Sequence, residues 1–510
     1  MDMRVTAEAS GSEGQPWTLP EGWCWAVLGD LANLIRGVSY KKEQSTSEYT
    51  REKIPLLRGN NIQSGYIDNT ELIYVNSDCV SPPQILDESD IILTMSSGSI
   101  SLIGKSAYFT SPSEKVTFGA FCGCLRSKDI IFARWIYHYL QTSYYRKKIS
   151  TAAKGTSLNN LKRDHLLSLP IPFCTPENIQ QICHKVDRLM AEVENGEAAL
   201  EEARKGLETF RRALLKSAVT GELTRDWREN NQPNETGHDL LARIKAERDA
   251  TPKSGRGKKA AASPPLDASD LPELPEGWAW ARLGQLLSHL TSGSRDWAEY
   301  YDKGSKVFVM AQNVRPGRFN HAYTKHVDPP DHLKDVKRSR IQRDDLLITI
   351  VGANTGDVCR VNFEATDFFV CQSVALMRPA LAELSQYLEM YLIAPDGGRR
   401  DMEKVIYGAG RPHLSFDQIE ALLIPIPPPA EMLEILGRTS GLLSAYSDTL
   451  MMLEAETADA ARLRQAVLKA AFEGKLVPQD PADEPASGLL SRLKAQESAN
   501  LKQTKRRKKV

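Results

Sequence analysis

Side chains that can bind phosphates and hydrogen-bond to bases are concentrated in the second half of this 510-residue chain. Five of them lie within ten residues, namely Lys334, Lys337, Arg338, Arg340 and Arg343, and Arg295, Arg315 and Arg318 precede them. Lysine and arginine neutralise phosphates, and arginine can also bind guanine in a bidentate way. A solvated charged face has a similar composition, so this pattern alone leaves two interpretations open.

Two pairs of polar loops supply further candidates. Asn60, Asn61 and Gln63 follow an apolar run in the first half of the chain, and Gln312, Asn313 and Arg315 follow one in the second. A later loop contains Lys154, Asn159 and Asn160, and its counterpart contains Arg411. Asn, Gln and Arg can bind adenine or guanine edges bidentately. The side chains differ between the halves while their surroundings match, which indicates two domains that bind different things.

Motifs that would indicate catalysis are missing from the sequence. There is no Gly-x-x-x-x-Gly-Lys-Ser/Thr loop to bind a triphosphate. Asp328-Pro-Pro-Asp331 ends in a residue that cannot stack on a flipped base, unlike the motif of amino-methyltransferases. Pro330-Asp331 with Asp335-Val-Lys337 has too short a spacing for a nuclease metal site, and the histidines are dispersed. We therefore expect no catalytic residue, no metal ligand and no cofactor in this chain.

Composition sets further limits. Lysine plus arginine number 65, as do aspartate plus glutamate, so a basic surface has to be local. The eight cysteines are scattered without a Cys-x-x-Cys pair, which favours reduced thiols. The N-terminus lacks the apolar core of a signal peptide, and no stretch approaches 18 continuous apolar residues. We expect a cytoplasmic protein with no membrane contact.

The elements that position these residues occur twice, because the chain is a tandem duplication. Leu19-Pro-Glu-Gly-Trp23 recurs as Leu274-Pro-Glu-Gly-Trp278, and Pro170-Ile-Pro172 recurs as Pro425-Ile-Pro427. The landmarks Asn61, Asp90 and Gly221 have counterparts in Asn313, Asp345 and Gly474. All keep one order at offsets of 252 to 255 residues, so each half should have the same fold.

A long helix with coiled-coil spacing closes each half. Apolar and small residues alternate in steps of three and four at Ile179, Ile182, Val186, Leu189, Val193, Gly196, Leu200, Ala203, Leu207, Phe210, Leu214 and Ser217. A second series runs through Met432, Leu436, Thr439, Leu443, Tyr446, Leu450, Leu453, Thr457 and Ala460. A lone helix of this kind could be a core helix or a homodimer zipper. Because the chain carries two, we expect them to pair antiparallel with each other.

The fold class predicted is α+β, with two tandem α/β domains separated by two long helices that form an antiparallel coiled coil. Each domain should contain short strands between turns and a helix, which we place at about 132–149 in the first. The expected boundaries are 1–16 for a disordered leader, 17–172 and 271–427 for the domains, 173–229 and 428–480 for the long helices, 230–270 for a flexible linker with a short helix at about 239–249, and 481–510 for a short helix and basic tail.

The duplicated order from Leu19 to Pro478 resembles the specificity (S) subunits of type I restriction-modification systems. The resemblance implies that each domain is a target-recognition domain that reads one half of a bipartite DNA site. It implies that the helices fix the spacing of the half-sites and dock two methyltransferase (M) subunits, with restriction/translocase (R) subunits as further partners. S-adenosylmethionine, ATP and Mg²⁺ would be used by those partner subunits, and this chain would bind double-stranded DNA without being an enzyme.

Two alternatives from other classes stay open at this point. One is a nuclease or adenine methyltransferase with an unrecognised active site, and purified protein would then cut or methylate DNA alone. The other is a coiled-coil scaffold for protein partners, which would show no sequence-dependent DNA binding.

Overall fold

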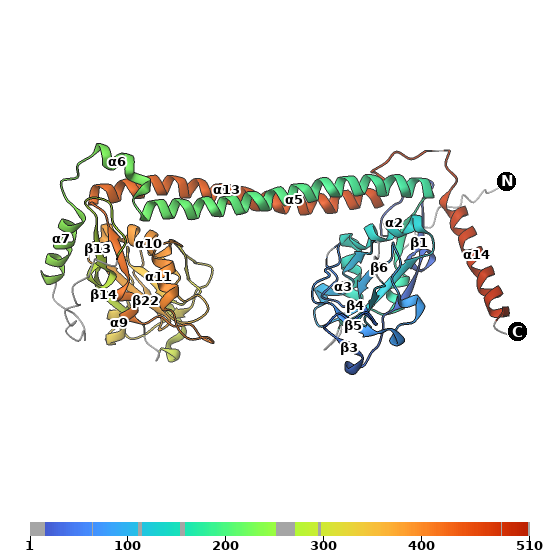
Figure 1. Cartoon of the computed structure of the whole chain (residues 1–510), viewed down its shortest axis with the longest axis horizontal. Helices are drawn as coiled ribbons and strands as arrows, with labels where there is room; N and C mark the ends of the chain where they lie inside the picture. Colours follow the sequence, from blue (N-terminus) through green and yellow to red (C-terminus); the bar gives the residue numbers. More distant parts are fainter. Residues whose placement is uncertain are drawn as a thin grey trace, which may run out of the picture. The chain divides into compact units, whose positions relative to one another are not determined.

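The computed structural model describes residues 16–63, 65–110, 115–153, 159–250, 271–293, 297–480 and 482–507. It divides into two compact units: unit 1 comprises residues 1–200 and 455–510, and unit 2 comprises residues 201–454. The strands of unit 1 are blue to cyan in Figure 1 and those of unit 2 are green to orange. Residues 1–15 of the expected leader lie outside the described residues.

Each unit contains a four-stranded antiparallel sheet with the same strand order. In unit 1 the order is β2 (Ala32–Arg36), β10 (Cys122–Ser127), β6 (Ile91–Thr94) and β8 (Ser106–Tyr108). In unit 2 it is β14 (Leu287–Ser292), β22 (Val374–Pro379), β19 (Leu346–Thr349) and β20 (Val358–Arg360). Strands β6 and β19 are buried on both faces, which explains their unbroken apolar runs. The duplication is therefore present in the fold.

A buried ion pair joins the same two strands in both sheets. The Arg126 guanidinium donates to the Asp90 carboxylate, with Nη2 and Oδ2 2.6 Å apart. Arg378 donates to Asp345 in the same way, with Nε and Oδ1 2.7 Å apart. Each aspartate also accepts a backbone N–H three residues upstream, so both carboxylates are fully partnered. The recurrence of Asp90 as Asp345 thus has a structural cause.

The second sheet differs between the units. In unit 1 it has four strands in the order β3 (Ser45–Thr46), β5 (Ile73–Asn76), β4 (Lys53–Leu57) and β9 (Thr117–Phe118). In unit 2 it has three, β18 (His326–Val327), β15 (Tyr301–Val309) and β21 (Phe368–Val370), beside the hairpin of β16 (Val314–Arg315) and β17 (Arg318–Phe319). β4 pairs with β9 in parallel, and β15 pairs with β21 in parallel. One parallel strand pair is therefore the feature that the two second sheets share.

Helices cover one side of each central sheet. The single helix expected at about 132–149 is in fact two, α2 (Ile130–Leu140) and α3 (Ser143–Ala152). Thr142 breaks the run because its extended backbone and its hydroxyl, which accepts the Tyr145 N–H, start a new helix. The corresponding helices of unit 2 are α10 (Ser385–Ile393) and α11 (Gly398–Val405).

The Pro-Ile-Pro segments form strands that lead into the long helices. β12 (Pro170–Phe173) pairs antiparallel with β1 (Cys24–Val27), and β23 (Leu423–Ile426) pairs likewise with β13 (Ala279–Arg282). Their alternate isoleucines are fully buried. Proline is tolerated because each of these sheets has only two strands, so one edge of each strand needs no partner.

The two long helices are α5 (Pro176–Val219) and α13 (Pro429–Phe472), labelled in Figure 1. In unit 1 the start of α5, at Ile179 and Ile182, shares a core with the end of α13, at Leu468 and Phe472. In unit 2 the end of α5, at Leu215 and Val219, shares a core with the start of α13, at Met432 and Ile435. Within both units the helices therefore run antiparallel.

The apolar seam predicted along α5 and α13 is buried near the helix ends, but its residues are more exposed in the middle. Phe210, which we expected in the seam, is 45% exposed, and Ala203 is exposed as well. In unit 1 a groove of about 620 Å³ lies between the helices around Gly196 and Ala460, because these seam residues are too small to fill it. Polar contacts replace apolar packing there. For example, the Arg464 guanidinium donates a hydrogen bond to the Glu197 carboxylate at 2.8 Å.

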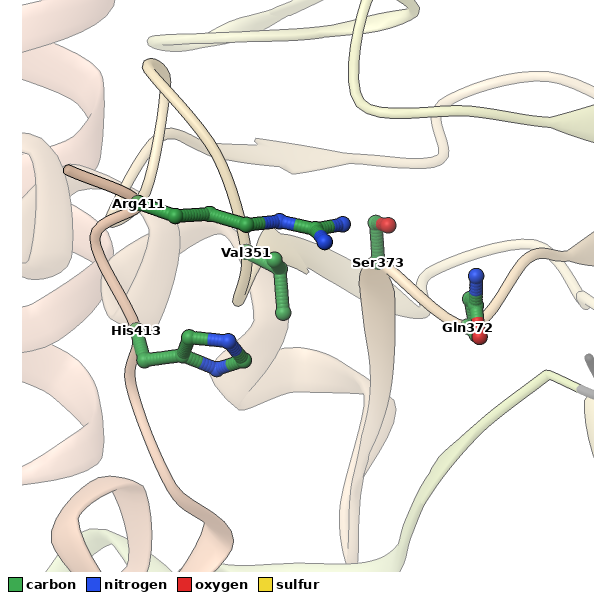
Figure 2. A pocket seen from close by; sticks show the side chains of 5 residues that line it. All are labelled: Val351, Gln372, Ser373, Arg411 and His413. Carbon is green, nitrogen blue, oxygen red and sulfur yellow. The ribbon is translucent and has the colours of Figure 1, made fainter. Parts of the chain in front are cut away.

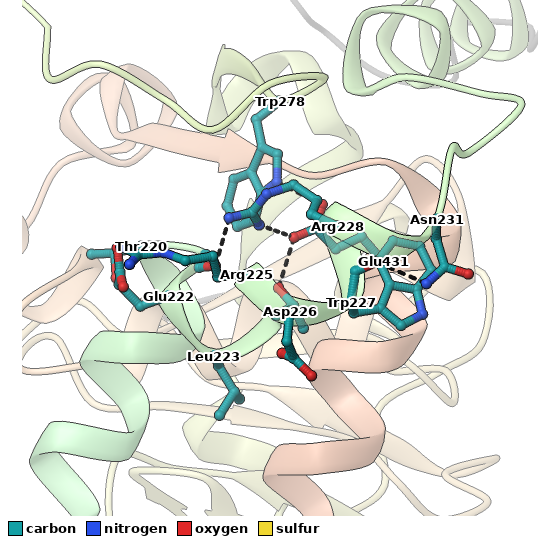
Figure 3. A network of polar contacts seen from close by, with 12 residues as sticks. Thr220, Glu222, Leu223, Arg225, Asp226, Trp227, Arg228, Asn231, Trp278 and Glu431 are labelled. Atoms are coloured by element: carbon teal, nitrogen blue, oxygen red, sulfur yellow. Dashed lines mark hydrogen bonds and ion pairs between the residues drawn. The ribbon is translucent and has the colours of Figure 1, made fainter.

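The second Leu-Pro-Glu-Gly-Trp motif clamps the helix ends of unit 2, as Figure 3 shows. Glu431, in the first turn of α13, is fully buried. Its carboxylate accepts hydrogen bonds from the Trp278 indole at 2.9 Å and the Thr224 hydroxyl at 2.7 Å, and it forms an ion pair with Arg228. Gly221, just after α5, has φ 75°, and an added Cβ would meet the ring of Pro275. The motif is thus a structural clamp.

Unit 1 has the same clamp with neutral amides in place of the buried charge. The Trp23 indole donates to the Gln479 side-chain oxygen at 2.8 Å. Asn178, which occupies the position of Glu431, donates to the Asp483 carboxylate at 2.8 Å. Gly474 is left-handed like Gly221, with φ 67°, and packs against the same motif. The repeat therefore extends past the long helices.

The segment 230–270 is not a flexible linker throughout, because the short helix expected at about 239–249 is present. It contains α7 (Gly237–Ala250), whose Leu240 and Ile244 are buried in the core of unit 2. The Gly237 N–H donates to the Gly277 carbonyl at 2.7 Å. Residues 251–270 lie outside the described residues.

α14 (Ala486–Arg507) is the counterpart of α7 and packs on unit 1. The Ala486 N–H donates to the Gly22 carbonyl at 2.9 Å, and Lys494 lies 2.9 Å from the Asp30 carboxylate. The last helix in the sequence thus completes the first globular core.

Candidate nucleic-acid interface

Three loop segments meet just after β6 in unit 1 and just after β19 in unit 2. The same backbone hydrogen bonds hold them together in both units. In unit 2 the Leu414 N–H donates to the Ile350 carbonyl at 3.0 Å, and the Ile350 N–H donates to Ser373 at 2.9 Å. In unit 1 Leu161 donates to Met95 at 2.8 Å, and Met95 donates to Phe121 at 2.8 Å. These shared backbone hydrogen bonds around Met95 and Ile350 form the same backbone frame in both units. The side chains around this frame can therefore vary without changing the fold.

In unit 2 these loops enclose a pocket of about 270 Å³. Its walls are Val351, Gln372, Ser373, Arg411 and His413, and Figure 2 shows the side chains converging from three segments. Arg411 and Gln372 are exposed. An exposed guanidinium beside an exposed carboxamide and a hydroxyl gives donors and acceptors suited to the edge of a base.

An aromatic pair supports one wall of this pocket. The Tyr407 and His413 rings are stacked, with centroids 5.9 Å apart and planes at 24°, and Tyr407 is 56% exposed. Backbone bridges join His413 to both Val351 and Tyr407. The loop that carries Arg411 is therefore fixed at its base, while its tip is open to solvent.

The equivalent place in unit 1 has different side chains. Phe121 stands where unit 2 has Ser373 and is 65% exposed. The short strand β11 (Asn159–Asn160) pairs with β7 (Ser96–Ser97), and the Ser96 hydroxyl donates to the Asn160 side-chain oxygen at 2.8 Å. Asn159 donates to the Gly98 carbonyl at 3.1 Å. Among the described residues at this place, the side chains are hydroxyl, amide and phenyl groups, whereas unit 2 has a guanidinium.

Two of the predicted base-contacting residues have a structural role instead. Asn61 and Asn313 are buried, and each side chain holds a turn. Asn61 accepts the Arg58 N–H at 2.9 Å and donates to two carbonyls, as Asn313 does with the Met310 N–H at 2.9 Å. Their amide groups have no free edge to offer a base, so this assignment is corrected.

The neighbours of these asparagines lie nearer the surface. Asn60, Gln312 and Arg318 are exposed. Gln63 is half-buried and accepts a hydrogen bond from Lys105 at 2.9 Å. The Arg315 guanidinium donates to the carbonyl of its own neighbour Val314 at 2.6 Å, so it supports the turn.

The basic cluster of unit 2 is largely occupied by internal contacts. Arg338 donates to the Asp335 carboxylate at 2.8 Å, and Arg343 lies 3.3 Å from Glu364. Arg340 donates to a backbone carbonyl at 3.2 Å and stacks over an aromatic ring. Lys337 is exposed on the short helix α9 (Lys334–Ser339). These side chains do not converge on the pocket at Arg411.

Lys154 and Arg295 lie outside the described residues. Gln372, Ser373 and His413 line the pocket and were not among the predicted residues. Aligning the two repeats through their shared backbone bonds would have pointed to them, because position 373 aligns with the exposed Phe121.

Across the described residues, no group of three His, Cys, Asp or Glu side chains could hold a metal ion. No helix in that part of the chain is both long and apolar enough to cross a membrane.

Known proteins resemble this chain over nearly its whole length. A family model described as a type I restriction modification DNA specificity domain matches residues 20–202. The EcoKI specificity subunit of Escherichia coli strain K12 is 30% identical, and the match covers 94% of this chain and 97% of that protein. The chain belongs to the specificity subunits of type I restriction enzymes. The StySPI specificity subunit of Salmonella potsdam is 29% identical, with 96% of this chain and 99% of that subunit covered.

A solved structure is similar in fold to this specificity subunit. That structure is described as the structural basis underlying complex assembly and conformational transition of the type I R-M system. It covers 90% of this chain and 100% of its own, with a TM-score of 0.62 at 18% identity. At that identity the likeness concerns the fold alone.

Proposed function

We propose that this specificity subunit gives a type I restriction-modification complex its DNA sequence preference, with each unit reading one half of a bipartite double-stranded target. One observation carries the proposal. The two units share a backbone frame around Met95 and Ile350, yet they place different polar side chains on it. A pair of readers for two different half-sites requires this combination, because bases are distinguished by side-chain contacts in the grooves.

The long helices would set the distance between the two half-sites and provide docking surfaces for two methyltransferase subunits. Their outer faces support this role, since Leu433, Met451 and Met452 on α13 are each more than half exposed. Exposed apolar side chains of this size are typical of protein interfaces. Restriction/translocase subunits would join the same complex.

Catalysis would belong to the partner subunits. S-adenosylmethionine, ATP and Mg²⁺ would be used there, and the chain would act without a catalytic group of its own. Since the target is chromosomal or invading DNA, we place the complex in the cytoplasm.

The proposal is tested by expressing the chain with its methyltransferase partner in a host that lacks adenine methylation. Genome-wide mapping of methylated adenines should give one motif made of two short sequences with a fixed unspecified spacer. The chain alone should produce no methylation. Methylation by the chain alone would favour the enzyme alternative. An assembled complex without any sequence preference would favour the scaffold alternative.

A further inference from the structure

Within the part of the chain that the structure describes, no side chain or carbonyl holds the Arg411 guanidinium, so it can bind a ligand. It is exposed at the mouth of the unit 2 pocket, and Figure 2 shows its guanidinium reaching across toward Ser373. By contrast, Arg378 and Arg399 are bonded to carboxylates at 2.7 and 3.1 Å. Gln372, on the far side of the pocket, is exposed too.

The backbone that carries Arg411 is fixed on both sides. The Gly352 N–H donates to the Pro412 carbonyl at 3.0 Å, and the Thr355 hydroxyl donates to the same carbonyl at 3.0 Å. His413 forms backbone bridges to Val351 and Tyr407. Because the backbone is already fixed, binding has to order only the side chain itself, and the position from which the guanidinium reaches a ligand is defined.

The surroundings of Arg411 suit a base edge better than a phosphate. The pocket combines a guanidinium with neutral groups, namely Gln372, Ser373, Val351 and the His413 ring. A site built for phosphate would use several cations or converging backbone N–H groups. A guanidinium beside hydrogen-bonding neutral groups matches the major-groove edge of guanine and its neighbour.

We propose that Arg411 is a specificity-determining residue, which donates two hydrogen bonds to O6 and N7 of a guanine in the half-site of unit 2, with Gln372 contacting the adjacent base. This inference rests on the proposed function. Unit 1 has Phe121, Ser96 and Asn160 around the same frame, so its half-site is read by different groups.

The test uses the full chain assembled with its methyltransferase partner. Competition binding is measured with duplexes that carry the mapped target, and each base pair is varied in turn. Arg411→Ala should lower discrimination at one G·C pair in one half-site by about 5- to 150-fold. Discrimination at the other half-site should not change.

Arg411→Lys separates base contact from phosphate contact. Lysine keeps the charge but lacks the bidentate fork, so it should not restore discrimination at that pair. Arg400→Ala is the matched control, because it removes an exposed arginine of the same unit that does not line the pocket. It should leave the ranking of all base pairs intact.

The inference is overturned if Arg411→Ala keeps wild-type discrimination at every base pair. It is also overturned if the variant weakens all sequences equally and lysine restores binding, since Arg411 would then contact a phosphate. A wild-type complex that shows no sequence preference would instead refute the proposed function, so the two failures are distinguishable.

Discussion

The carboxylate of Glu431 accepts a hydrogen bond from the indole Nε1 of Trp278 at 2.9 Å, and both residues are buried. This bond joins the first turn of α13 to the Leu-Pro-Glu-Gly-Trp motif, so unit 2 and its helix ends share one polar core. Arg228 balances the buried charge.

Removing that carboxylate should loosen the clamp. Glu431→Ala leaves Arg228 without its ion-pair partner and the Trp278 indole without an acceptor. Losing one partner of such a network costs about 2 kcal/mol or more. Hydrogen exchange should therefore speed up in peptides that cover residues 220–231 and 429–440. Glu229→Gln, which alters an exposed neighbour of Arg228, is the control and should leave exchange unchanged. Equal effects of the two variants would contradict the clamp.

Acid should destabilise unit 1 through His138. This histidine is buried on α2 with Nε2 2.9 Å from Asp187 of α5, and burial lowers its pKa below 6.5 even though Asp187 opposes the shift. The unfolded chain then binds the proton more readily, so the stability that the neutral ring provides is present above pH 6.5 and is lost as pH falls below it.

The comparison that checks this is the free energy of unfolding of the wild type and His138→Gln between pH 5 and 8. The wild type should lose more stability on acidification than the variant. His184, exposed on α5, the helix that carries Asp187, provides the control variant His184→Gln, which should follow the wild type. A His138→Gln profile parallel to that of the wild type would contradict the assignment.

The sequence predicted the frame of each unit well but not the residues around it. The paired landmarks Asp90 and Asp345 marked equivalent strands because each aspartate has to meet an arginine on the neighbouring strand. Asn61 and Asn313 looked like base contacts since they are polar and lie in loops, but their amides hold turns. Whether an amide faces solvent or its own backbone is decided by contacts seven to ten residues away.

Two further errors had long-range causes. Phe210 kept the heptad spacing, yet it is exposed, because spacing alone does not say which positions of a seam the partner helix covers. The pocket residue Gln372 was missed because it meets Arg411 only through the bridge between Val351 and His413, which are about sixty residues apart. Comparing the two repeats by backbone bonds, rather than by residue type, recovers this place.

The helix pair should act as the ruler of the DNA spacer. Adding one heptad to α5 after Gly196 and one to α13 before Ala460 preserves the seam, because both sites line the same groove. Each insertion lengthens its helix by about 10 Å. At about 3.4 Å per base pair the spacer should grow by roughly three base pairs.

Methylated-adenine mapping of the doubly lengthened chain gives the spacer directly, and both half-site sequences should be unchanged. A single insertion in α5 shifts one side of the seam only, and it should reduce activity instead. Full activity with the original spacer in the double insertion would assign the ruler to the partner subunits.

The most direct test of the central claim exchanges one reader and leaves the rest of the chain intact. Residues 32–169 are replaced by the equivalent segment of a related specificity subunit, which keeps β1, β12 and the Trp23 clamp in place. Mapping methylated adenines should show one half-site replaced by that of the relative, with the other half-site and the spacer unchanged. A change in both half-sites, or in neither, would contradict the account of two independent readers on one helical frame.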